Sequence, residues 1–141
     1  MDDPPHKAFV RAYLDQSLPD AFEEGVVAAV QHDLHALGIE VQAVTLDGLE
    51  TDRHAHERAR AEFEPEVVLV VSFHALSTSG FSTRAAVEMT LLDAHDEALW
   101  GYEQHFDLSA SGRKGLSRAG QRVGNAAVQR LVDDRVFPGP V

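Results

Sequence analysis

The chain contains no cysteine, so disulfides, thiolate metal sites and a thiol nucleophile are all excluded. No apolar run approaches the roughly 20 residues of a membrane-spanning helix. The first residues, Met1 to Phe9, include no apolar segment typical of a signal peptide. Neither a G-x-G-x-x-G motif nor a P-loop occurs, which removes the usual nucleotide-binding signatures. The chain therefore lacks the covalent, membrane and nucleotide motifs that would indicate a function directly.

Basic side chains are scarce and unevenly distributed. The chain carries 12 Lys and Arg against 23 Asp and Glu, a net charge of −11. Residues 1–108 hold 21 acidic and 6 basic side chains, whereas residues 109–141 hold 6 basic and 2 acidic ones. Nucleic-acid binding needs a basic surface over the bulk of the domain, so this charge argues against a nucleic-acid partner. The same charge argues against an anionic membrane face, which leaves a protein or a small molecule as the expected partner.

The composition that is present is that of an ordinary globular protein, with 44% hydrophobic and 25% charged residues. A chain of 141 residues has the size of one domain and should bury roughly two-thirds of its unfolded surface. We expect a single domain over residues 1–141, with a flexible leader at 1–6 and a C-terminal tail at 136–141.

The strongest pattern is a hairpin over residues 83–108. Its two halves alternate apolar and polar side chains with the period of a half-buried strand. A short polar turn at 94–97 joins them. Trp100, the one tryptophan of the chain, should pack against the last helix. The inward rows are Ala85, Val87, Met89 and Leu91, then Ala98, Trp100, Tyr102 and Phe106.

The remaining segments predict the order β-α-β-α-β-β-β-α. Strands are expected over 7–14, 39–46 and 67–71, and helices over 17–37, 51–63 and 113–134. Ser17 should cap the first helix and Gly38 should end it, while residues 75–82 indicate a loop. This order predicts an α/β, α+β-like mixed sheet with a C-terminal antiparallel hairpin and its helices on one face. Small residues such as Gly120 and Gly124 should let the last helix approach the sheet.

The arrangement resembles a known group of domains. A helix ending in L-x-x-x-G, then EPEVVLVV, a strand with LLD, a short turn, ALW and a helix before FP span most of the chain. This pattern is similar to the small periplasmic α/β domains of bacterial envelope lipoproteins, such as the TolB N-terminal domain, the CsgG-type domain and LpoB. Asp93 and Trp100 mark its hairpin. The resemblance implies a domain that acts by binding and assembly, and no catalytic residue is carried over.

The resemblance also implies a periplasmic location with an outer-membrane lipid anchor, without insertion of the domain itself into the membrane. We therefore expect the native reading frame to extend upstream by a signal peptide that ends in a lipidated cysteine. A cytoplasmic protein that begins at Met1 is the alternative.

Eight histidines raise the question of a metal site. His32 and His35 stand three apart on the first helix, and His54 and His56 stand two apart on the second. Metal ligation needs converging imidazoles with second-shell support. Both pairs lie on polar helical faces beside acids, so we interpret them as solvated surface and predict no metal and no cofactor.

A catalytic triad is the other chemical interpretation to weigh. His74 ends the central strand, near Ser72, Ser77, Ser79 and Asp93 in the pattern. No nucleophile elbow or oxyanion signature accompanies them. We interpret His74 as a buried, hydrogen-bonded residue and predict that the protein is not an enzyme.

One electrostatic feature remains, and we call it the basic stripe: Arg113, Lys114, Arg118 and Arg122. The spacing of four stacks these side chains along one exposed face of the last helix. They either face acidic neighbours of the same chain or meet an acidic partner. Together with Phe81, a large apolar residue in a polar segment, they form the predicted partner-binding residues.

The leading functional hypothesis is a non-catalytic envelope domain that binds a protein partner. An acidic inhibitor or immunity-type protein that neutralises a basic partner is one alternative. A small-molecule-binding α/β domain that uses residues 75–82 is another.

Overall fold

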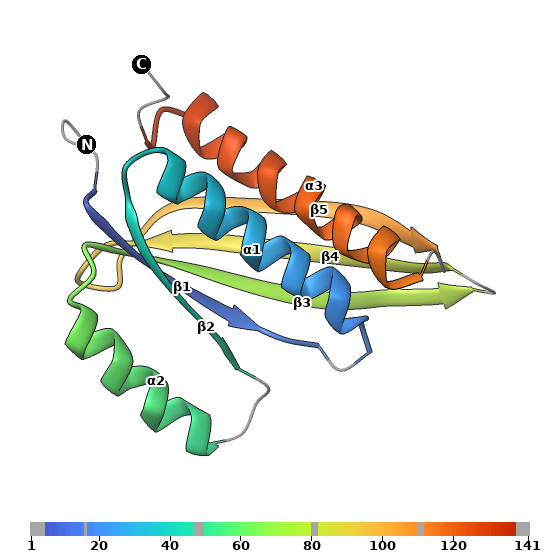
Figure 1. The fold of residues 1–141 in the computed structure, drawn as a ribbon, viewed down its shortest axis with the longest axis horizontal. Coiled ribbons are helices and arrows are strands. Elements are labelled where there is room, and N and C mark those ends of the chain that lie inside the picture. The colour runs from blue at the N-terminus through green and yellow to red at the C-terminus, as the bar shows by residue number, and fades with distance from the viewer. Residues whose placement is uncertain (1–4, 16, 47–49, 80–81, 110–111, 138–141) are drawn as a thin grey trace.

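The computed structural model describes residues 5–15, 17–46, 50–79, 82–109 and 112–137, and leaves out the side chains of residues 50–56, 79 and 109. Its elements confirm the predicted order (Figure 1). The strands are β1 (Lys7–Tyr13), β2 (Glu40–Leu46), β3 (Val67–Ser79), β4 (Ser82–Leu92) and β5 (Ala98–Ser109). The helices are α1 (Asp20–Ala36), α2 (Glu50–Phe63) and α3 (Gly112–Asp133).

The five strands form one mixed sheet in the order β2-β1-β3-β4-β5. β1 pairs in parallel with β2 and β3, while β4 is antiparallel to both β3 and β5. The β-branched run of β3 therefore lies at the centre of the sheet, as its continuous apolar sequence predicted. The mixed α/β fold and the closing hairpin are likewise confirmed.

The helices lie on both faces of the sheet, so the prediction of one covered face was wrong. Ala8 and Val10 of β1 belong to the main core beneath α1 and α3. Phe9 points the other way, and its ring lies 6.3 Å from that of Phe63 in α2. The reason is the strand order, because β2 and β3 flank β1 on opposite sides. Two right-handed crossovers that run in opposite directions place their helices on opposite faces. The side of the sheet that faces away from α1 and α3 is the outer face.

The predicted loop over residues 75–82 was also wrong. β3 continues to Ser79, and the pairing with β4 runs out to the Ser79–Ser82 pair, with a bulge between Ala75 and Ser77. Small polar side chains gave no apolar alternation there, so the sequence pattern missed a strand that cross-strand hydrogen bonds hold in place.

α1 and α3 pack unusually closely through glycine. A Cβ added at Gly120 would overlap the backbone oxygen of Phe22, and one at Gly124 would overlap that of Val26. The later glycine of α3 meets the later residue of α1, so the two helices run parallel. The small residues of α3 thus permit close approach to α1, whereas approach to the sheet was predicted.

Two ends of the fold differ from the sequence interpretation. Pro19 is the N-cap of α1 and no side chain caps it, because Ser17 bonds to Asp15 instead. At the C-terminal end of the chain, Phe137 is 1% exposed, so the packed core includes part of the segment assigned to the tail. Gly38 ends α1 with a φ of 86°, as predicted.

Candidate protein-binding surface

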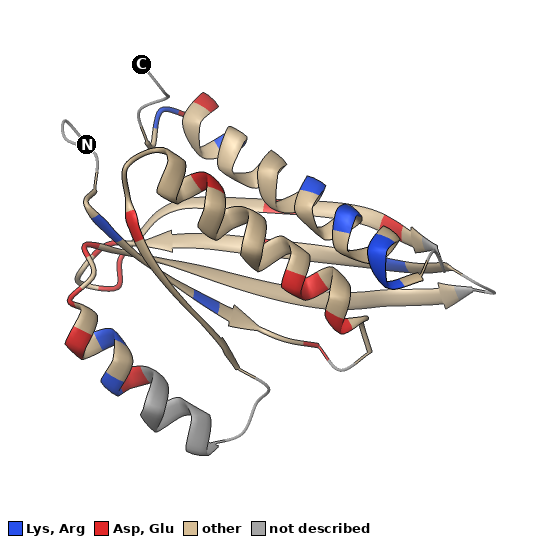
Figure 2. Cartoon of the chain, in the orientation of Figure 1, with Lys and Arg blue, Asp and Glu red and all other residues tan. Residues whose placement is uncertain are grey.

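α3 holds the basic stripe on its exposed side. One side of the helix is buried in the core through Val123, Ala127 and Leu131. Residues on the opposite side are therefore exposed to solvent. Arg113, Lys114, Arg118 and Arg122 are all exposed. Figure 2 shows these blue positions gathered on the first half of α3, beside the acidic start of α1.

The basic stripe was predicted either to pair with acids of the same chain or to meet an acidic partner, and its residues differ in this respect. The guanidinium of Arg113 donates to the carboxylate of Glu24 on α1 at 3.2 Å. Lys114, Arg118 and Arg122 form no ion pair with any residue that the structure describes. One member thus faces an acidic neighbour of the same chain, and three are available to another molecule. Phe81, the other predicted binding residue, lies outside the described residues.

The position of the basic stripe works against stability. The first turn of α3 contains no acidic residue and two basic ones, at the end where the helix dipole is positive. Parallel packing also brings the positive end of α1 to the same place. Of the two basic residues in this first turn, Arg113 has a described acidic partner, Glu24, and Lys114 has none.

An apolar seam runs beside the basic stripe, between β5 and α3. Its residues are partly buried and pack against the core. Trp100 stacks on Tyr102 with ring centroids 5.7 Å apart, and its indole N–H donates to Asp134 at 2.9 Å. Trp100 therefore lies at the margin of the core, partly exposed. The seam consists of Trp100, Tyr102 and Phe106 of β5 with Leu116 and Ala119 of α3.

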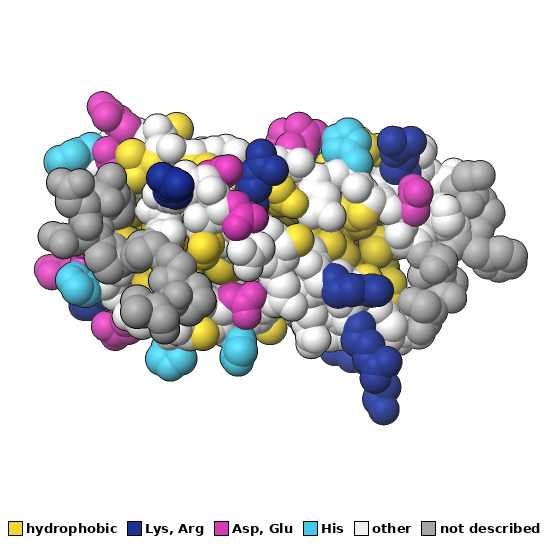
Figure 3. All heavy atoms as spheres, turned by 90° about the horizontal axis from the view of Figure 1, so that it is seen from above, with side chains coloured by type: hydrophobic (Ala, Val, Ile, Leu, Met, Phe, Trp, Pro, Cys, Tyr) yellow, Lys and Arg dark blue, Asp and Glu magenta, His cyan; other side chains and the backbone are white. Residues whose placement is uncertain are grey.

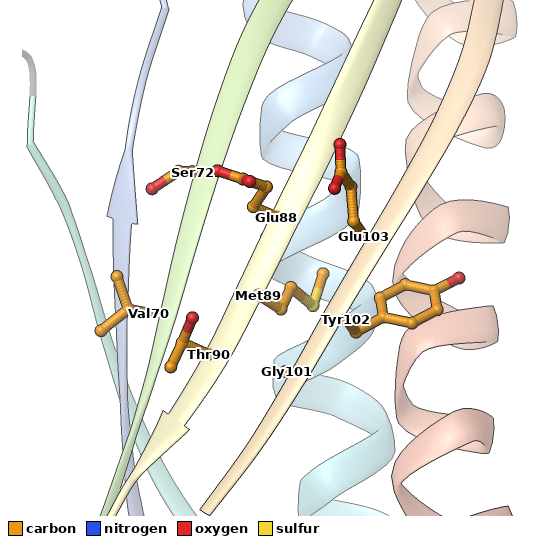
Figure 4. A pocket seen from close by; sticks show the side chains of 8 residues that line it. All are labelled: Val70, Ser72, Glu88, Met89, Thr90, Gly101, Tyr102 and Glu103. Atoms are coloured by element: carbon orange, nitrogen blue, oxygen red, sulfur yellow. The ribbon is translucent and has the colours of Figure 1, made fainter. Parts of the chain in front are cut away.

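The outer face carries a different, acidic surface. Glu88 of β4 stands directly opposite Glu103 of β5, an arrangement of like charges that disfavours the pairing. Together with Ser72 and Thr90 they line a shallow hollow of about 450 Å³. Figure 4 shows these side chains on the side of the strands turned away from α1 and α3.

The histidines of this region are exposed and paired with acids. The imidazole of His74 lies 3.2 Å from Glu88, and that of His105 lies 2.8 Å from Glu103. The prediction of a buried His74 was therefore wrong, because His74 points to the outer face where α2 does not reach. Among the described side chains, no serine forms a hydrogen bond with His74, whose described partner is Glu88.

The other histidine pairs do not gather ligands in the described part of the chain. His32 and His35 are both exposed on α1, with His32 bonded to Asp33 at 3.2 Å. The side chains of His54 and His56 lie outside the described set. Among described residues, no three His, Asp or Glu side chains stand close enough to hold a metal ion.

A buried acid stands where β1 ends and α1 begins. Glu23 is 1% exposed, and one carboxylate oxygen accepts from the backbone N–H of Asp15 at 3.0 Å. Its other oxygen has no hydrogen-bond partner among the described atoms. Burial, reinforced by the nearby charges of Asp15 and Asp20, raises the pKa of Glu23 to about 7 although the Asp15 bond opposes the shift.

Asp15 ties this acid to the sheet. Its carboxylate accepts from Ser17, and also from the backbone N–H of Ala75 at the β3 bulge, at 3.1 Å. The bonds from Ser17 hold the pKa of Asp15 below its usual range. Glu23 was not singled out from the sequence. The signal that could have placed it was its spacing of three, four and seven from Val26, Val27 and Val30.

Comparison with known proteins gives structural similarity alone. No protein-family model matches the sequence, and no curated protein matches it significantly. Lipoprotein GNA1162 from Neisseria meningitidis is similar over 92% of this chain and 99% of its own, with 16% identity and a TM-score of 0.55. Hypothetical protein CT253 from Chlamydia trachomatis covers 92% and 93%, with 18% identity and a TM-score of 0.41. No described helix is long and apolar enough to cross a membrane. The chain therefore has a fold similar to that of a lipoprotein from Neisseria meningitidis.

Proposed function

We propose that this chain is a non-catalytic domain of the envelope lipoprotein type that binds a protein partner through the basic stripe. The observation that carries the proposal is that Lys114, Arg118 and Arg122, exposed along the first half of α3, pair with no acid that the structure describes. Lys114 lies in the first turn, where a positive charge reduces helix stability, so a binding role accounts for it better than a structural one. A negatively charged partner surface would supply the missing counter-charges.

The envelope placement is supported by the fold similarity to a Neisseria lipoprotein. It predicts a native reading frame with an upstream signal peptide and a lipidated cysteine. Metabolic labelling with a palmitate analogue, followed by fractionation of the membranes, tests this part directly. Recovery of an unlabelled protein from the cytoplasm would contradict it.

The binding role is tested by reversing the charge of the basic stripe. We expect Lys114→Glu, Arg118→Glu and Arg122→Glu together to abolish capture of envelope proteins by the immobilised domain. All three side chains are exposed, so the variant should keep its fold, which circular dichroism checks.

A matched control reverses three basic side chains elsewhere. Arg58 on α2, Arg84 on β4 and Arg135 after α3 are also exposed, and their exchange for glutamate changes the net charge equally. This control variant should retain the captured protein. Equal loss in both variants would show that net charge alone governs binding and would defeat the proposal.

The acidic outer face favours a second candidate function, an inhibitor that neutralises a basic partner. Its support is the opposed pair Glu88 and Glu103 in the exposed hollow. Glu88→Gln with Glu103→Gln should then release a captured basic protein, whereas the triple substitution in the basic stripe should not.

A further inference from the structure

We infer that β5, the seam and the basic stripe together form a docking site for an extended, acid-bearing segment of another protein, which joins the sheet as a sixth strand. This inference rests on the proposed partner-binding function and names the form of the partner. It is carried by three features of the described structure that meet along one edge of the molecule.

The first feature is an open strand edge. β5 stands at the end of the described sheet and pairs with β4 alone, from the Ser82–Ser109 pair to the Leu92–Ala98 pair. Such an edge presents backbone N–H and C=O groups that natural proteins usually shield with charged side chains, proline, bulges or a covering helix. β5 contains no lysine or proline, its acids Glu103 and Asp107 lie on the outer face, and α3 packs mainly on α1 rather than over β5.

The second feature is an apolar floor beside that edge. Tyr102 and Phe106 of β5 and Ala119 of α3 are partly exposed and continuous with the core. Figure 3 looks onto this edge and shows hydrophobic surface running through its middle, between charged side chains on either side. An added strand would place every second side chain over this floor, because side chains alternate between the faces of a sheet.

The third feature is the basic rim of the floor. Arg122 follows Ala119 by three residues on α3 and therefore stands beside the floor, and Arg118 stands one turn before Arg122 on the same side of the helix. Neither pairs with any described acid. Acidic side chains in the floor-facing row of an added strand would reach these guanidinium groups, which bind carboxylates well.

Charge also selects against a second copy as the occupant. β5 carries Glu103 and Asp107 on its outer face, and pairing two β5 strands would align their acids, which disfavours the sheet. The floor-facing row of β5 offers no acid to Arg118 and Arg122. A segment of a different protein, with apolar and acidic residues in one row and neutral residues in the other, satisfies both faces. This is β-augmentation, in which backbone bonds supply affinity and alternate side chains supply specificity.

The test uses three short blocked peptides on the folded chain. In the acidic peptide, glutamate alternates with valine along one row and threonine fills the other. The basic peptide replaces glutamate with lysine. The third is the acidic peptide with N-methylated amides, which cannot pair as a strand. The fluorescence of Trp100 reports binding, and NMR amide exchange locates it.

We expect the acidic peptide to bind and to slow amide exchange along β5, while the other two bind at least tenfold more weakly. Arg118→Glu with Arg122→Glu should weaken the acidic peptide by about tenfold and favour the basic one. The matched control, Arg58→Glu with Arg135→Glu, should bind the acidic peptide as the wild type does.

The outcomes separate the inference from the proposed function. If the N-methylated peptide binds equally, or exchange slows elsewhere, strand addition is wrong while a charge-based partner site at the basic stripe stands. If no peptide binds at millimolar concentration while the triple substitution still abolishes capture of the partner, the inference alone falls. A chain that dimerises through β5 in sedimentation experiments would also overturn it.

Discussion

α1 and α3 lie side by side and parallel on one face of the sheet, yet their first turns carry opposite charge (Figure 2). α1 begins with two acids, Asp20 and Glu23, and the exposed Asp20 complements the positive end of its dipole. α3 begins with Arg113 and Lys114 and no acid. The same physical environment therefore holds a stabilising arrangement in one helix and a destabilising arrangement in the other.

This difference separates residues that build the fold from residues that we propose serve binding. The acids at the start of α1 complement its dipole, and Glu24 pairs with Arg113, so the charges of α1 serve mainly the stability of the fold. α3 keeps one side in solvent, where its charges are available to a partner. Glu23 is the exception within α1, because it is buried and leaves one oxygen without a described hydrogen-bond partner.

The largest effect is expected at the contact between the two helices. In Gly120→Ala, the added methyl group would overlap the backbone of Phe22, and separating two packed helices strains the whole interface. We expect a loss of at least about 3 kcal/mol in the free energy of unfolding, at the upper end for overpacked cores. Urea denaturation measures it.

Gly101 provides the matched control for that change. It lies on β5, and a Cβ added there meets no atom within 4 Å. Gly101→Ala should leave the free energy of unfolding within about 1 kcal/mol of the wild-type value, since glycine weakens a strand slightly. If both variants lose similar stability, close packing of α1 against α3 at Gly120 is not what makes the substitution costly, and this prediction is wrong.

The next effect is the pH dependence due to Glu23. Its pKa rises from 4.5 in a free chain to about 7 in the fold, so between these values the folded state holds a proton that the unfolded state has released. The free energy of unfolding should therefore fall as pH rises through this window, by roughly 2–3 kcal/mol, and stay level above it. Denaturation midpoints at a series of pH values measure the slope.

Glu23→Gln removes the titrating group and should remove that contribution to the slope. Its neighbour Glu24, exposed and paired with Arg113, supplies the control, because Glu24→Gln should keep the wild-type slope. A wild-type slope in Glu23→Gln would mean that the buried acid does not hold its proton in the fold.

The features predicted from the sequence are those set by local periodicity. The row Ala85, Val87, Met89 and Leu91 is buried as its alternation required, and the apolar stripe of α3 gave its buried side. The features that were missed depend on neighbours distant in sequence. β3 beyond Ala75 is fixed by its register with β4, and the face covered by α2 depends on the strand order.

The candidate binding surface likewise has one part that local spacing predicted and other parts that depend on tertiary packing. The spacing of the basic stripe predicted one exposed row, and the structure places it there. The seam was not predicted, because the partial exposure of Leu116 and Ala119 depends on how α3 packs against α1. The open edge of β5 is likewise a property of strand order, which no local pattern contains.

The smallest effect concerns Lys114 and sharpens the comparison most. Lys114→Glu gives α3 the acidic first turn that α1 already has. Because the helix dipole then favours the new charge, the free energy of unfolding should rise by about 0.5–1 kcal/mol, with Lys114→Gln giving roughly half. High salt should shrink both gains, since exposed charges are screened. The same change should weaken capture of the partner, so stability and binding move in opposite directions. A loss of stability in Lys114→Glu would show that Lys114 supports the fold, and the basic stripe would then lose the argument that its charges are placed for binding.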